Sequence, residues 1–184
     1  MLLIAAWEVN MRSGALVALL LAVASSVLAQ NQPQQLPDPV VSATREMEDR
    51  QSKNLIAAAE EMPEALYSYK PTPGQMSFGH LVVHVIESNN NLCSLLGSQK
   101  QKLGFADTDP KATLVRGLKD SFWFCKQVLD KASDANLGVP VQLPGGNTGA
   151  QATVLIRLVA GWADHYSAAA MYLRLNNFVP PSAK

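Results

Sequence analysis

Three histidines are the residues of this chain whose type and spacing are best suited to chemistry. His80 and His84 are four residues apart, so a helix would carry them on one face, one turn from each other. Neutral imidazoles at this spacing can bind a transition metal, and metal sites in helix bundles are built from facing helices. His165, near the end of the chain, is the remaining candidate ligand. Pairs at this spacing also arise by chance, so packed core or surface histidines are the alternative.

Four amphipathic segments must position these histidines. They span about residues 40–61, 77–97, 108–132 and 149–176, with Ser77 as a helix-capping residue and Pro110 at a helix start. A Gly- and Pro-rich loop covers residues 136–148, and no stretch shows the sustained alternation of a strand. The pattern predicts an all-α protein, a four-helix bundle.

The N-terminus has the pattern of a secretory signal peptide rather than of a folded element. A short basic start at Met11-Arg12 precedes an apolar run, and Val27 and Ala29 suit the recognition positions for cleavage before Gln30. Residues 1–29 are therefore predicted to be a signal peptide, with Met11 as an alternative start, and residues 30–39 a polar leader. The apolar run is shorter than the roughly 20 residues of a membrane span. We expect an exported protein, periplasmic or extracellular.

The amino-acid composition limits the classes of partner that this chain is expected to bind. The chain has 15 basic and 15 acidic residues, a formal net charge of zero, and no run of like charge. This balance argues against nucleic acid, whose phosphates require a basic surface. No membrane span is expected after signal cleavage. An unknown small molecule is the expected partner, and the sequence leaves homodimer formation open.

In an exported protein, the two cysteines, Cys93 and Cys125, would lie in an oxidising compartment. Disulfides form and persist in an oxidising compartment. Cys125 lies on an apolar helical stripe with Leu118 and Phe122, so it is expected to face inward. These features favour a Cys93–Cys125 disulfide, and two buried free thiols are the alternative.

A set of short motifs stands in a characteristic order between residues 40 and 182. They are AAEEMP (58–63), YSYKP (67–71), SFGHLVVH (77–84), SFWFC (121–125), HY (165–166), YLR (172–174) and VPPS (179–182). In this order and spacing they resemble an exported bacterial branch of the DinB-like domain family. The resemblance implies a DinB-type four-helix bundle over residues 40–182, and the cysteine positions of that branch match Cys93 and Cys125.

The resemblance also implies a divalent metal, zinc or nickel, held by three histidines. One lies on the second helix and two lie four residues apart on the last helix. Carried onto this chain, these positions are His84, Gly161 and His165, and glycine has no side chain with which to bind a metal. His80 could replace the missing ligand, because it shares a helix face with His84. Asp164 is less suited, because it is turned by about 100° from His165 around the helix.

Two functions follow from these residues. One is an exported DinB-like protein of unknown substrate with a degenerate metal site, a binding or scaffold protein without metal chemistry. The alternative is an active metal-dependent hydrolase or thiol transferase acting on a small molecule. Gly161 favours the first.

Overall fold

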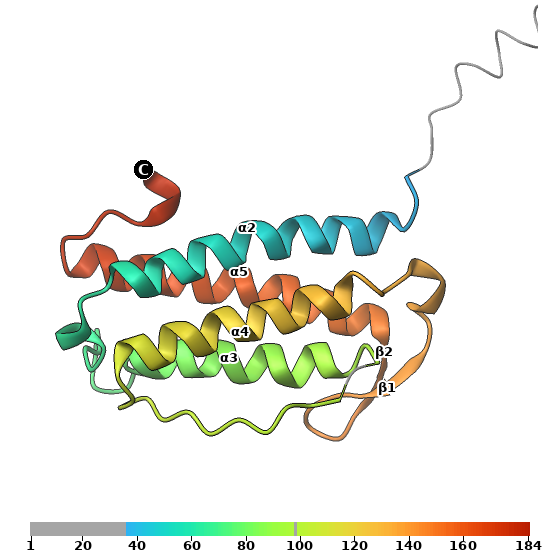
Figure 1. Ribbon diagram of the computed structural model, residues 1–184, viewed down its shortest axis with the longest axis horizontal. Coiled ribbons are helices and arrows are strands. Elements are labelled where there is room, and N and C mark those ends of the chain that lie inside the picture. Colours follow the sequence, from blue (N-terminus) through green and yellow to red (C-terminus); the bar gives the residue numbers. More distant parts are fainter. Residues whose placement is uncertain (1–35, 98) are drawn as a thin grey trace, which may run out of the picture. The chain divides into compact units, whose positions relative to one another are not determined.

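Four α-helices form the fold of the described part of this chain (Figure 1). The computed structural model describes residues 36–97 and 99–184, and residues 37–184 form one compact unit. The helices are α2 (Pro39–Glu61), α3 (Phe78–Ser94), α4 (Lys111–Leu129) and α5 (Gln151–Leu175). The predicted four-helix bundle is confirmed. The predicted signal peptide and most of the leader lie outside the described residues.

Helix direction decides which residues meet across the bundle. Figure 1 shows α2 and α5 running one way and α3 and α4 running the other way. Because α3 and α4 are parallel, the chain must return along the bundle between them, and residues 99–110 make this crossing. The Asn90 side chain fixes the crossing by exchanging two hydrogen bonds with the backbone of Gln101, of 2.8 and 2.9 Å.

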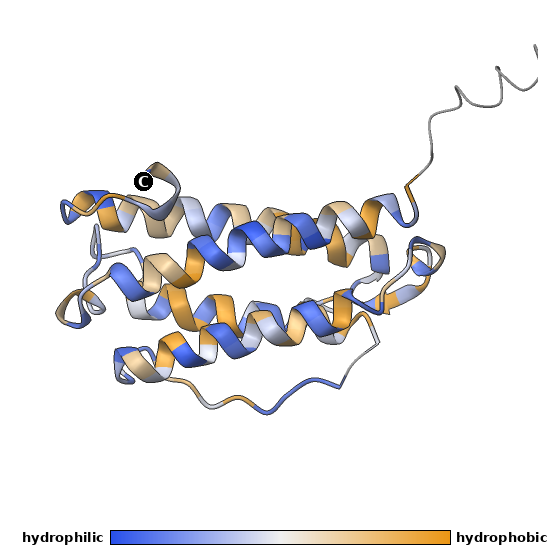
Figure 2. Ribbon diagram, turned by 45° about the horizontal axis from the view of Figure 1, so that its top comes forward, coloured by the Kyte–Doolittle hydropathy of each residue, from blue (hydrophilic) through white to orange (hydrophobic). Residues whose placement is uncertain are grey.

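Burial of one face of each helix holds the bundle together. Figure 2 shows hydrophobic and hydrophilic residues alternating around the helices, which is the amphipathic pattern that the sequence predicted. The largest fully buried side chains come from all four helices and include Leu114, Leu118, Leu155, Leu158 and Trp162. The core therefore lies between the helices, and the buried residues of α5 extend from Val154 to Leu173.

The Gly- and Pro-rich loop before α5 contains a small antiparallel hairpin that the sequence analysis missed. Its strands, β1 (Pro140–Gln142) and β2 (Thr148–Ala150), have three residues each. Gly145 and Gly146 make the turn with φ angles of +94° and +84°, which glycine adopts without strain. Strands this short give no recognisable alternation in the sequence. The hairpin leads directly into α5 and so fixes where that helix begins.

Polar contacts at one end of the bundle fix α2 against the rest. Asp134 accepts hydrogen bonds from the backbone N–H groups of Val40 and Val41, at 3.0 and 2.9 Å. In return, Asp38 accepts one from the Asp134 backbone at 2.7 Å. The Arg45 side chain donates to the carbonyl of Leu129, at the end of α4. These bonds satisfy groups that helix ends otherwise leave unpaired.

The inner face of α2 carries three buried polar side chains, Thr44, Glu48 and Gln51, among its apolar ones. Glu48 is buried, and this burial raises its pKa to about 7. Gln51 is buried as well, and its Oε1 has no hydrogen-bond partner among the described residues. The α2 side of the core is thus less completely paired than the side facing α3, which is described below.

A helix that crosses a membrane must be both long and apolar. No helix within residues 36–97 and 99–184 has this combination of length and hydropathy.

Candidate functional site

The first two turns of α3 carry His80 and His84, as the sequence predicted. Ser77 is the N-cap, and its hydroxyl accepts a hydrogen bond from the backbone N–H of His80 at 3.1 Å. Gly79 lets the chain around Asp107 approach closely, because a Cβ at this position would lie 2.5 Å from the Asp107 carbonyl oxygen. The Ser77 cap and the close approach of the Asp107 backbone therefore fix the start of α3.

Two tyrosines fix α5, which carries the other half of the site. The hydroxyl of Tyr172 donates a hydrogen bond of 2.6 Å to the carbonyl of Met76, just before α3. The hydroxyl of Tyr166 accepts one of 2.8 Å from the backbone of Ser182. The first bond ties α5 to the segment that leads into α3, and the second ties α5 to the C-terminal segment.

The structure brings together two of the three histidines. The rings of His84, on α3, and His165, on α5, have centroids 4.9 Å apart and planes inclined by 82°, an edge-to-face contact. Only 16% of the His165 side chain is exposed. Its burial, together with the neighbouring His84, lowers the pKa of His165, and the carboxylate of Asp164 opposes this only in part. His165 is therefore predominantly neutral at pH 7, the form that has a lone pair to offer.

Gly161 lies one turn before His165 on the same face of α5. A Cβ built on Gly161 would meet only the Nε2 atom of His165, at 3.7 Å, with nothing else within 4 Å. The backbone here is helical, so a side chain would be unstrained. Position 161 is thus open space beside the histidine pair, where the family resemblance places a ligand.

The two candidate replacements lie at the edges of the site. The His80 side chain is 55% exposed, and its Nδ1 atom is 3.7 Å from Oδ2 of Asp107. Asp164 is 85% exposed, and its Oδ2 atom is 3.7 Å from Nδ1 of His165. Across the described part of the chain, no three His, Cys, Asp or Glu side chains converge as metal ligands would. Two imidazoles and a glycine do not fit a three-histidine centre.

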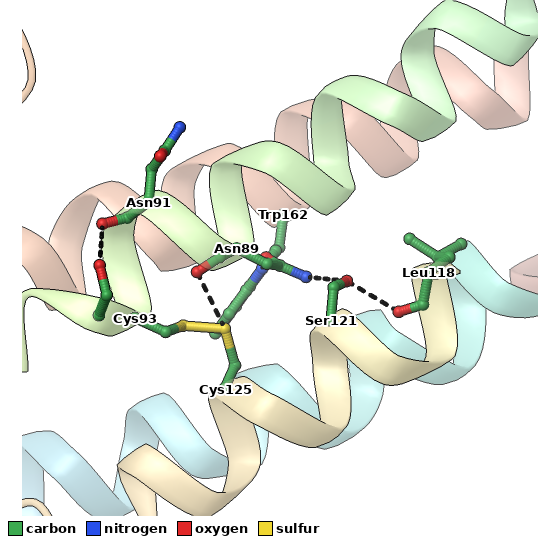
Figure 3. The surroundings of a disulfide bond; sticks show 8 residues. Asn89, Asn91, Cys93, Leu118, Ser121, Cys125 and Trp162 are labelled. Carbon is green, nitrogen blue, oxygen red and sulfur yellow. Dashed lines mark hydrogen bonds between the residues drawn. A yellow bond between two sulfur atoms is a disulfide. The ribbon is translucent and has the colours of Figure 1, made fainter. Parts of the chain in front are cut away.

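A buried polar network that the sequence analysis did not identify lies about one turn along α3 from His84 and one turn along α5 from His165. Figure 3 shows the network itself. The indole N–H of Trp162 donates a hydrogen bond of 2.7 Å to the Asn89 side-chain oxygen. The Asn89 amide donates to the hydroxyl of Ser121 at 3.0 Å, and that hydroxyl donates to the Leu118 carbonyl at 2.8 Å. Every polar side-chain atom in the network has a partner. It joins α3, α4 and α5 at one level of the bundle.

The disulfide lies directly beside this network, as Figure 3 shows. Cys93 and Cys125 are linked as predicted, with Cα atoms 5.3 Å apart, and both residues are fully buried. The bond crosses from α3 to α4, one turn beyond Asn89. It therefore fixes the two helices that support the network.

A cavity of about 140 Å³ opens above the network, between α3 and α5. Asn89 and Trp162 form part of its wall, with Gly161 and His165 on the same side as Trp162. The remaining lining residues are Ser88 and Leu92 from α3 and Arg157 and Leu158 from α5. This cavity is the candidate functional site.

The DinB superfamily model matches residues 48–167, which include the histidine pair, the gap at Gly161 and the buried network. The chain belongs to the DinB superfamily. No curated protein matches it. The family assignment agrees with the resemblance that the sequence motifs indicated, and it covers all four helices at least in part.

Solved structures of DinB-like proteins have the same fold. One from Bacillus subtilis is 17% identical, with a TM-score of 0.62 over 74% of this chain and 94% of its own. One from Bacillus cereus is 15% identical, with a TM-score of 0.61 over 71% and 89%. A mycothiol-dependent maleylpyruvate isomerase is 13% identical, with a TM-score of 0.58 over 69% of this chain and 59% of the isomerase. At these identities the likeness concerns the fold.

Proposed function

We propose that this chain is an exported DinB-superfamily protein that binds a small molecule in the α3–α5 cavity, with a degenerate metal site. The observation that carries the proposal is the open space at Gly161 beside the His84–His165 pair. The fold is that of the family, and the cavity lies beside the position where the family resemblance implies a third ligand. The activity that depends on a complete metal centre is then lost, and binding remains.

The number of protein ligands is the physical reason to expect weak metal binding. A catalytic zinc site normally has three protein ligands and keeps a fourth position for water or substrate. With two imidazoles, this chain would hold zinc or nickel weakly, since each missing ligand removes a bond that the rigid helices would otherwise supply at little entropic cost.

Export is supported by the disulfide. A buried Cys93–Cys125 bond suits an oxidising compartment such as the periplasm or the cell exterior. The predicted signal peptide of residues 1–29 would bring the chain there.

A second candidate is an active metal-dependent hydrolase or thiol transferase. The observation in its favour is that His80 lies one turn before His84 and is half exposed. In this alternative His80 leaves Asp107 and supplies the third nitrogen. A mycothiol-dependent isomerase has a similar fold, so this fold is compatible with thiol-dependent chemistry.

Calorimetric titration with zinc and nickel separates the two candidates. We expect the unmodified protein to bind weakly, with a Kd above about 10 µM, and Gly161→His to bind at least about 100-fold more tightly, a gain of about 2.7 kcal/mol. Gly161→Ala is the matched control: it fills the same Cβ position without a ligand and should not change the affinity. Tight one-to-one binding by the unmodified protein, lost in His80→Ala, would refute the proposal and establish the second candidate.

A further inference from the structure

Two stripes of residues face each other across the cavity. On α5 the stripe is Arg157, Gly161 and His165, spaced four residues apart, and on α3 it includes Ser88 and Leu92. The helices are antiparallel, and His165, which contacts His84 on α3, lies at one end of the cavity. Arg157 therefore lies at the opposite end, two turns from His165.

Arg157 brings a positive charge to that end. The residue is exposed, and none of the ion pairs formed within the described part of the chain includes it. A guanidinium presents several N–H donors in a planar fork that matches a carboxylate. The carboxylate of Asp164 brings a negative charge near the other end, with its Oδ2 atom 3.7 Å from Nδ1 of His165. The cavity is thus electrostatically polarised along its length.

Between these ends the wall is mainly apolar and the space is small. Leu92, Leu158 and Trp162 contribute apolar surface, and Gly161 contributes no side chain. A volume of about 140 Å³ equals the liquid volume of four to five water molecules, at roughly 30 Å³ each. A ligand of this site is therefore short, with an apolar body.

We propose that the cavity binds a small aliphatic monocarboxylate, with its carboxylate on Arg157 and its apolar body over Gly161 toward the histidine pair. The inference rests on the binding function proposed above and names the class of ligand. A single arginine at one end and Asp164 at the other select one carboxylate, because a second carboxylate would approach the Asp164 charge. Arg157 is the residue that determines the charge of the ligand.

Propionate is a suitable probe, and the uncharged propionamide of nearly the same shape is its matched control. Binding can be followed by NMR through the indole N–H of Trp162, which lines the cavity, while that of Trp123, exposed on α4, is the internal reference. We expect propionate to shift the Trp162 signal with a Kd of about 1–10 mM, a range compatible with five heavy atoms. Propionamide should bind at least about tenfold more weakly, since it forms no charge-assisted pair.

Arg157→Gln should weaken propionate binding at least about tenfold, because it removes the charge but keeps polar length. Arg174→Gln is the control: it removes the same charge from an exposed position nearer the end of α5 and should change the Kd less than about twofold. Equal binding of propionate and propionamide, or unchanged binding in Arg157→Gln, would overturn the inference.

The metal titration keeps this result separate from the proposed function. If Gly161→His gains zinc affinity and propionate leaves the Trp162 signal unchanged, the ligand class is wrong and the degenerate site stands. If propionate binds through Arg157 but Gly161→His gains no zinc affinity, the ligand class stands and the account of the degenerate metal site is wrong.

Discussion

The rim and the floor of the α3–α5 cavity differ in how completely their polar groups are paired. At the rim, His84 and His165 contact each other beside the empty position 161. At the floor, Asn89 and Trp162 are hydrogen-bonded to each other in a network next to the disulfide. The paired groups of the floor stabilise the fold, while the rim is the part of the cavity where a side chain is missing. This difference is the one expected of a protein that has the fold of its family and the degenerate metal site proposed above.

The largest expected effect concerns the floor. Replacing both cysteines, with Cys93→Ala and Cys125→Ala, should lower the free energy of unfolding by about 3–4 kcal/mol, because the disulfide closes a 32-residue loop in the unfolded chain. Urea denaturation of the variant and of the oxidised parent measures this difference. A loss below about 1 kcal/mol would contradict the view that the disulfide stabilises the floor.

A smaller effect is expected from the network itself. Asn89→Ala should cost about 2–3 kcal/mol in unfolding free energy, because it leaves the buried indole N–H of Trp162 without an acceptor. Asn91→Ala is the matched control, with the same change two residues along α3 at a partly exposed position. It should cost about 0.5 kcal/mol or less. Equal costs for the two variants would mean that the floor is no better paired than the surface.

Much of the fold was predictable because it depends on local patterns. The apolar periodicity gave four helices, and Ser77 marked the start of α3 correctly. Helix ends were less certain: α3 ends at Ser94 rather than near Gly97, and α4 ends at Leu129 rather than near 132. Hydrogen-bonded turns follow both helices. The residues in such turns are of the same types as those in a last helical turn, so the sequence does not separate the two.

The site was predictable only in part. The contact between His84 and His165, and the disulfide, followed from the residue types together with the family resemblance. The network of Asn89 and Trp162 did not, because periodicity shows that a residue is buried but does not identify its partner on another helix. One signal was present: Asn89 lies on the same stripe as Ile86 and Cys93, and a polar residue on an apolar stripe needs a partner.

The rim is tested most directly by asking which histidines a restored metal site requires. Zinc affinity would be measured for Gly161→His alone and in combination with His84→Ala, His165→Ala or His80→Ala. We predict that the gain of about 100-fold is lost with His84→Ala and with His165→Ala, and changes less than about threefold with His80→Ala, since His80 lies at the edge beside Asp107. No gain in Gly161→His, or a gain that survives His84→Ala but needs His80, would contradict the account.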